Sequence, residues 1–242
     1  MIKTKNKPQA VIFDFWNTLI YDLPDVEEKR GKYRIEKIHE ILIRHDIRVS
    51  ISDVSFAYEA AGKMITELAK NNRALTIREQ IRLMAETIRF IPDRELIEKL
   101  EDAYNRANLL FLSPLVPGAE EMIESLFRKY KLGLISNTER SSGKHLTMAY
   151  HNLMKRFSVT YFSDERKLRK PHPETYLTTA AELAVDPIDC VMVGDDEEKD
   201  CTPAVVCGMR AILFADPKRG IKSDFSPQAS TLSQLAQILE KM

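Results

Sequence analysis

The feature that most constrains the fold is one strand signal that stands far from any possible partner. Residues Ala10–Phe13 are apolar, and the run breaks at Asp14 into polar, turn-forming residues. A short apolar run bounded in this way predicts a strand buried in a parallel sheet. The next strand pattern begins only at Leu132. The sheet that contains the first strand must therefore be completed by residues far along the chain.

The residues between these two signals have helical periodicity throughout, from about 25 to 111. Apolar side chains recur every three or four residues in four successive stretches: Ile35, Ile38, Leu42 and Ile43; Val54, Ala57, Ala61, Ile65 and Leu68; Ile81, Met84, Ala85 and Ile88; Leu96, Leu100, Tyr104 and Ala107. Four amphipathic helices in series, with no strand among them, predict a helical bundle inserted into another domain. We call this bundle the cap and expect it at about residues 21–112.

Beyond Pro114 the pattern changes to alternating strands and helices. The predicted strands are Leu132–Ser136, Val159–Phe162, Cys190–Val193 and Ala211–Phe214. The predicted helices are one opened by Pro117 and Gly118 and running through Tyr130, then Ser141–Phe157, one from Pro173, a short one near Thr202–Val206, and Leu232–Leu239. Such repeats predict an α/β fold, a doubly wound parallel sheet with helices on both faces. We expect this core at residues 1–20 and about 113–242.

Composition argues against several classes of partner. Lysine plus arginine and aspartate plus glutamate are equal, at 36 each, so no overall field favours nucleic acid or an anionic membrane. No apolar run approaches the roughly 20 residues that span a bilayer. The basic segment Met1–Pro8 lacks the apolar stretch of a signal peptide. We expect a cytoplasmic protein, monomer or homodimer, that acts on a small molecule.

Polar residues follow three of the predicted strands at the point where each strand ends. Asp14 follows the first strand, Ser136 and Asn137 the second, and Asp195 and Asp196 a later one. A single aspartate after a strand is most often a turn residue or a helix cap. Three such ends at one edge of a parallel sheet instead predict a ligand crevice, because open α/β sheets bind ligands there.

These residue types suit phosphoryl transfer. A carboxylate such as Asp14 splits the hydrolysis into two steps through an aspartyl intermediate. Asp14 and Asp195 would repel each other unless a hard cation lay between them, and Mg²⁺ takes carboxylate and carbonyl oxygen. Lys170, in the loop before Pro171, and the Ser136 hydroxyl would stabilise the charge on the phosphoryl oxygens.

Over its whole length the sequence resembles the haloacid dehalogenase (HAD)-like hydrolase superfamily, in the branch with a four-helix cap after the first motif. Four motifs carry the resemblance, in order: Asp14-Phe15-Trp16-Asn17-Thr18 for D-x-D-x-T, Ser136 for the strand-terminal hydroxyl, Lys170-Pro171-His172-Pro173 for K-P-x-P, and Gly194-Asp195 with Asp200 for the acidic motif. Each motif alone is moderately specific, and all four together form a strong signal.

The resemblance implies a Mg²⁺ site and a nucleophile. Asp14 is implied to be the nucleophile and a metal ligand. The main-chain carbonyl of Trp16 and the carboxylate of Asp195 would complete the ligands from the protein.

Further residues are implied to support this centre. The phosphate site would be lined by Thr18, Ser136 and Asn137, and metal-bound waters or Lys170 would be oriented by Asp196 and Asp200. For Asp200 the alternative is an acid on the side of a helix with no part in the site.

Trp16 is the main departure from the family pattern, because phosphatases of the family carry there the aspartate that protonates the leaving group. Haloacid dehalogenases have an aromatic residue at this position and need neither the acid nor a metal. Their acidic motif differs, however, and the GDDEEKD stretch around Asp195 favours a metal. No clear counterpart of the dehalogenase cap arginine is present, although Arg30 and Arg34 lie near the cap entrance.

Three functions therefore stay open at this point. The first is a Mg²⁺-dependent phosphohydrolase, the second a metal-independent 2-haloacid dehalogenase, and the third a catalytically weak HAD-like binding protein. His172 is a weak candidate for a replacement acid, because the variable residue of K-P-x-P usually faces solvent.

Overall fold

Each strand predicted from the sequence lies in one six-stranded sheet of the computed structural model, which describes residues 7–242. The spatial order is β3-β2-β1-β4-β5-β6, and every neighbouring pair is parallel. The strands are β1 Ala10–Phe13, β2 Lys131–Ser136, β3 Val159–Phe162, β4 Cys190–Gly194, β5 Arg210–Phe214 and β6 Gln228–Ala229. The predicted α/β fold is thus confirmed. The predicted start of the core and most of the basic N-terminal stretch fall in residues 1–6, outside the described part.

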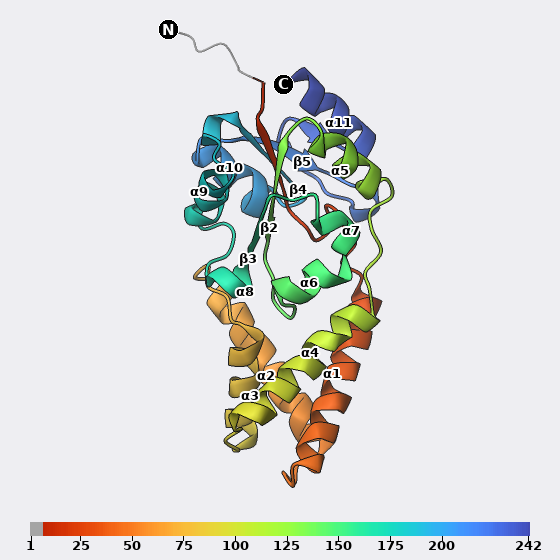
Figure 1. Cartoon of the computed structure of the whole chain (residues 1–242), viewed down its shortest axis with the longest axis vertical. Helices are drawn as coiled ribbons and strands as arrows, with labels where there is room; N and C mark the ends of the chain where they lie inside the picture. The colour runs from red at the N-terminus through yellow and green to blue at the C-terminus, as the bar shows by residue number, and fades with distance from the viewer. Residues whose placement is uncertain (1–6) are drawn as a thin grey trace.

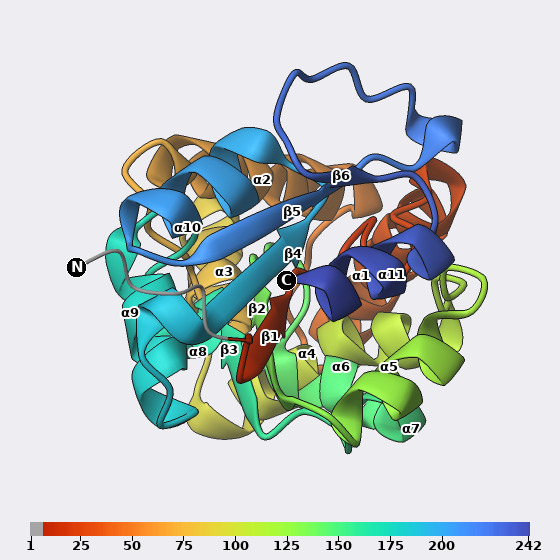
Figure 2. The same cartoon turned by 90° about the horizontal axis from the view of Figure 1, so that it is seen from above.

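Two layers of helices cover the sheet because its strands are apolar on both faces (Figure 2). One face packs against α5 Ala119–Phe127, α6 Gly143–Ala149, α7 His151–Met154 and α11 Leu232–Lys241. The other face packs against α9 Pro173–Glu182 and α10 Thr202–Val206. In β1, Val11 and Phe13 belong to the first layer and Ala10 and Ile12 to the second.

The four predicted cap helices are present and lie together at one end of the molecule (Figure 1). They are α1 Pro24–Arg44, α2 Ile51–Ala69, α3 Ile77–Ile88 and α4 Arg94–Leu110. Ser50 and Thr76 begin α2 and α3 with capping boxes, and the Asp93 carboxylate caps α4. The bundle has its own apolar core, built around residues such as Leu42, Val54 and Leu100.

The helical periodicity was misleading at one position of α1. Ile43 was expected on the apolar face but is 47% exposed. Arg30 and Arg34 are instead fully buried, at 1% and 0% exposure. Both arginines find partners that offset the cost of burial: Arg30 donates to the Phe111 carbonyl and Arg34 to the Asn108 side chain, each at 2.9 Å.

Other elements differ from the sequence-based prediction. The single helix expected over Ser141–Phe157 is broken at Tyr150, whose hydroxyl exchanges two 2.9 Å hydrogen bonds with the Ser113 backbone. Short elements were not predicted: β6, the helix α8 Ser163–Arg166, two 3₁₀ turns, Pro187–Asp189 and Pro217–Arg219, and the π-helix Glu197–Cys201. Within residues 7–242, no helix has the length and apolar character needed to cross a lipid bilayer.

Candidate active site

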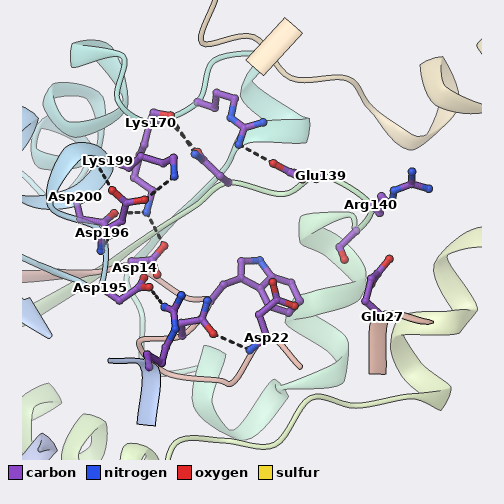
Figure 3. Close-up of a pocket in the computed structure, with 16 residues that line it drawn as sticks. Asp14, Asp22, Glu27, Glu139, Arg140, Lys170, Asp195, Asp196, Lys199 and Asp200 are labelled. Carbon is purple, nitrogen blue, oxygen red and sulfur yellow. Dashed lines mark hydrogen bonds and ion pairs between the residues drawn. The ribbon is translucent and has the colours of Figure 1, made fainter. Parts of the chain in front are cut away.

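A crevice of about 410 Å³ lies where the carboxyl ends of β1, β2 and β4 face the cap (Figure 3). The core and α1 of the cap both contribute to its wall, which is dominated by charged side chains. The lining residues are Asp14, Trp16, Asn17, Asp22, Glu27, Asn137, Glu139, Arg140, Ser141, Arg169, Lys170, Asp195, Asp196, Lys199, Asp200 and Arg219. Most of the residues predicted from the strand ends are therefore brought together.

Lys170 lies at the centre of the site, between two buried carboxylates. Its Nζ is 2.5 Å from Asp14 Oδ1 and 2.5 Å from Asp200 Oδ1. The loop that carries it is fixed by Asn137, whose Oδ1 accepts from the Lys170 amide at 2.9 Å and whose Nδ2 donates to the Lys170 carbonyl at 3.0 Å. Asn137 thus orients the lysine loop as well as lining the crevice.

Asp195 completes a group of three acidic side chains. One carboxylate oxygen from each of Asp14, Asp195 and Asp200 lies within 4.8 Å of the others. Asp195 also forms an ion pair with Arg219, which comes from the 3₁₀ turn after β5. No sequence motif points to Arg219, because the turn that brings it here is set only by the fold.

Burial shapes the electrostatics of this cluster. It raises the pKa of Asp14 to about 6 and that of Asp200 to about 7, while the charge of Lys170 acts in the opposite direction. Burial and the charge of Asp200 also raise the pKa of Asp195. The Lys170 pKa is raised by Asp14 and Asp200 against the effect of its own burial, so Lys170 stays protonated. Three carboxylates beside two cations, Lys170 and Arg219, leave an excess of one negative charge when all are ionised.

Three further residues predicted for the site, Thr18, Ser136 and Asp196, differ in their hydrogen bonding. Thr18 is buried and donates to Asp14 Oδ2 at 3.1 Å. The Ser136 hydroxyl is buried without a hydrogen-bond partner among the described residues. Asp196 accepts from the amides of Glu198 and Lys199, both at 3.0 Å, and so begins the π-helix.

His172 does not line the crevice. It precedes α9, where its Nδ1 accepts from the Glu174 amide at 3.3 Å.

The wall nearest the cap was not predicted from the sequence. Glu139 pairs with Arg169 at 2.8 Å, and Arg140 stacks on Tyr58 of α2 with its guanidinium carbon 3.9 Å from the ring centre. Asp22 also lies on this wall. The only signal in the sequence for Glu139, Arg140 and Arg169 was their closeness in the chain to Asn137 and Lys170, and for Asp22 its closeness to Asp14.

The donor set fits a hard divalent cation. The carboxylates of Asp14, Asp195 and Asp200 offer oxygen ligands within reach of one ion, and their excess negative charge favours one. Asp14 is also exposed to the crevice beside a fixed cation, Lys170. A carboxylate in this setting can act as a nucleophile toward an anionic, electrophilic substrate.

Comparison with known proteins found a matching family model and relatives of similar sequence. The model of a protein family described as haloacid dehalogenase-like hydrolase matches residues 8–208. N-acylneuraminate-9-phosphatase of Rattus norvegicus is 23% identical over 98% of this chain and 96% of its own. Phosphoserine phosphatase of Thermus thermophilus is 30% identical over 56% of this chain and 52% of its own.

Two solved structures share the fold over nearly their whole length. A 2-haloacid dehalogenase from Pseudomonas syringae has a TM-score of 0.70 and 20% identity, covering 97% of this chain and 99% of its own. A HAD phosphatase from Thermococcus onnurineus has a TM-score of 0.62 and 20% identity, covering 96% and 97%.

Proposed function

Because this chain belongs to the haloacid dehalogenase-like hydrolase family, we propose that it is a Mg²⁺-dependent phosphohydrolase acting through an aspartyl-phosphate on Asp14. One observation carries the proposal: the Asp14 carboxylate lies in the crevice beside Lys170 and within 4.8 Å of two further carboxylates. A nucleophile and a hard-cation site are thereby adjacent. Several relatives of similar sequence are phosphatases, which supports the same reaction.

Each residue has a distinct part in this proposal. Asp14 attacks phosphorus, and Thr18 and Lys170 hold its carboxylate in place. Lys170 also binds a phosphoryl oxygen, where negative charge develops in the transition state. The lining residue Asn137 and the buried Ser136 hydroxyl supply the neutral part of the phosphate site.

Mg²⁺ would be held by Asp14, Asp195 and the Trp16 carbonyl. When bound, it would neutralise charge on the phosphoryl group and on the carboxylates. Asp200 fixes Lys170 through the 2.5 Å ion pair, and Asp196 fixes the start of the π-helix that carries Asp200.

The cap, which we propose to span about residues 21–112, would decide which substrate enters. Glu27 of α1 lines the crevice, and the crevice volume of about 410 Å³ suits a small phosphorylated metabolite. This size and the presence of Lys170 beside Asp14 support that substrate class.

Dehalogenation is the second candidate, favoured by one residue, Trp16. An aromatic side chain replaces the usual acid there, and a halide leaves without a proton. The cluster of Asp14, Asp195 and Asp200 counts against it, because carboxylates packed with so little positive charge call for a metal.

The proposal is tested with p-nitrophenyl phosphate and 2-chloropropionate as parallel substrates, with and without Mg²⁺. We expect hydrolysis of the phosphate ester only, and only with Mg²⁺. Asp14→Asn should abolish this turnover while the protein stays folded, and beryllofluoride should bind the parent but not the variant. Chloride release without added metal would overturn the proposal in favour of the dehalogenase.

A further inference from the structure

The proposed reaction needs a proton for the departing oxygen of an alkyl phosphate. Trp16, which stands where the family's acid would be, cannot supply it. The described residues that line the crevice include no histidine, cysteine or tyrosine. Apart from the strand-end acids of the metal and lysine cluster, the lining carboxyls are those of Asp22, Glu27 and Glu139. Among the acidic side chains, these three are the candidates for donating a proton to the leaving group.

Two of the three carboxylates are already committed to arginines. Glu27 accepts from Arg34 at 2.8 Å and lies 3.6 Å from Arg30, both of them buried. Glu139 accepts from Arg169 at 2.8 Å. Neither carboxylate can turn toward a leaving group without giving up its guanidinium partner.

Asp22 is different, because no ion pair or side-chain hydrogen bond engages its carboxylate within residues 7–242. Its backbone is nonetheless well fixed: the Asp22 amide donates to Asn17 Oδ1 at 3.0 Å, and the preceding amide, of Tyr21, donates to the Pro114 carbonyl at 2.9 Å. In the view of Figure 3, Asp22 lies between the strand-end acid Asp14 and Glu27 of the cap.

The surroundings of Asp22 raise the pKa of its carboxyl. Partial burial, the largest cause, and the charge of Glu27 raise the pKa of Asp22. The charge of Arg30 acts against this, and the smaller effects of Glu139 and Arg219 raise and lower the pKa, respectively. These groups come from α1, from the loop after β2 and from the turn after β5. Asp22 is thus the crevice carboxyl outside the catalytic cluster that is unpaired, exposed and raised in pKa.

We infer that Asp22 is the general acid of this chain, in place of the missing acid at Trp16. The inference rests on the proposed phosphohydrolase function. One Asp14 oxygen forms a bond to phosphorus, the bond from phosphorus to the leaving oxygen breaks, and its electron pair takes the proton from the Asp22 carboxyl. In the second step water attacks the aspartyl-phosphate, and the Asp22 carboxylate accepts the proton that the water loses. Phosphate leaves, and both aspartates return to their starting states.

The test compares Asp22→Asn with the parent on an alkyl phosphate and on p-nitrophenyl phosphate, whose leaving group needs little protonation. Asp25→Asn is the matched control, because Asp25 is three residues away, largely exposed, paired with Lys29 and outside the crevice. For Asp22→Asn we expect kcat/KM to fall by about 10²–10⁴ on the alkyl phosphate. It should change little on p-nitrophenyl phosphate, because kcat/KM reports only the steps up to leaving-group departure.

The second half-reaction gives an independent signature. Without Asp22 to accept the proton from water, kcat for p-nitrophenyl phosphate should fall, and a burst of p-nitrophenolate stoichiometric with enzyme should appear. In the parent, kcat/KM for the alkyl phosphate should decline as pH rises through the pKa of Asp22, and this decline should vanish in Asp22→Asn. Asp22→Glu keeps a carboxyl group and should retain the decline of kcat/KM with pH. This variant keeps the test valid even if Asp22→Asn folds poorly.

If Asp22→Asn lowers kcat/KM equally on both substrates, or on neither, the assignment of Asp22 is overturned and the phosphohydrolase function stays intact. A parent protein that hydrolyses neither ester would instead refute the proposed function itself. The two failures are therefore distinguishable from the parent measurements alone.

Discussion

At the scale of single residues, the carboxylates around Lys170 would link the proposed binding of Mg²⁺ to pH. Mg²⁺ binds the ionised form of its ligands, whereas burial raises the pKa of Asp14 to about 6 and that of the neighbouring Asp200 to about 7. Above pH 7 both groups are largely ionised, and the metal binds without displacing protons. As pH falls from 7 to 5, protons increasingly compete with the metal.

We therefore predict that Mg²⁺ affinity falls as pH is lowered through this window and that binding near pH 6 releases protons. Titration calorimetry in two buffers of different ionisation enthalpy measures the release directly. Trp16, the one tryptophan of the sequence, lines the crevice and offers a fluorescence signal for the same titration. Equal affinity at pH 5.5 and pH 8 would contradict this description of the cluster.

The sequence allowed some of these residues to be predicted and not others, for a physical reason. Asp14 and Asp195 follow apolar strands, so their place at one sheet edge follows from the parallel topology. Asp22 and Arg219 reach the crevice through irregular segments, which have no periodicity to read. Arg34 falls in register with the apolar face of α1 but could not be recognised as buried, because its partners lie on other helices.

At the scale of elements, the junction between β4 and the π-helix sets the position of Asp200. Gly194 ends β4, and a Cβ added there would lie closer than 3.0 Å to the carboxyl group of Asp200. The absence of a side chain at this glycine lets the π-helix fold back against the strand end. Asp200 can then reach Lys170 and also accept from the Asp196 amide at 3.1 Å.

Gly194→Ala should therefore impair catalysis more than folding. Asp200 would have to move away from Lys170, and a misplacement of about 1 Å in such a site costs about 10²-fold in rate. The control is Gly31→Ala in α1, where the nearest atoms are 3.8 Å away on the Tyr58 ring. That change should stabilise the protein by about 0.5–1 kcal/mol through helix propensity and leave activity unchanged.

Measurements of kcat/KM with p-nitrophenyl phosphate, beside urea unfolding, test this pair of variants. Unimpaired turnover in Gly194→Ala would show that Asp200 need not hold its present position.

Helices and strands could be predicted from the sequence where residues close in the chain determine them. The strands β1 and β3 and the helix α10 have the bounds predicted from apolar runs and turn residues. The break at Tyr150 depends on a hydrogen-bonded pair with Ser113, 37 residues away in the chain. The strand β6 has only two residues and exists through pairing with β5, so no local pattern marks it.

At the scale of the whole molecule, the loop that carries Asn137 and the loop that carries Lys170 are both bonded to the cap. The loop after β2 receives a hydrogen bond from Arg34 of α1, which donates to the Arg140 carbonyl at 2.7 Å. The segment before Lys170 pairs with the turn between α2 and α3: Arg73 and Leu168 form an antiparallel bridge, and the Arg169 amide donates to the Asn72 carbonyl at 3.0 Å. The cap therefore contacts the catalytic loops directly, on two sides of the crevice.

Gln80 of α3 is the clearest of these links and can be tested without altering the crevice wall. It is fully buried, donates to the Glu139 carbonyl at 2.6 Å and accepts from the Tyr104 hydroxyl at 2.9 Å. Gln80→Met keeps the side-chain volume but leaves both partners without their bonds, which should lower the free energy of unfolding by about 1–3 kcal/mol. Arg82→Met, at an exposed position of the same helix, is the control and should change it by less than about 0.5 kcal/mol.

If the cap positions the catalytic loops, Gln80→Met should also lower kcat and raise KM together, because the loop that carries Asn137 and Glu139 loses an anchor. Its Mg²⁺ affinity should equal that of the parent, since Gln80 lies outside the carboxylate cluster. Calorimetry for the metal, steady-state kinetics and urea unfolding measure the three quantities on one preparation. A loss of stability with unchanged kinetics would mean that the bond to Glu139 is structural only. Weakened Mg²⁺ binding would instead mean that the cap acts on the metal site and not on the phosphate loops.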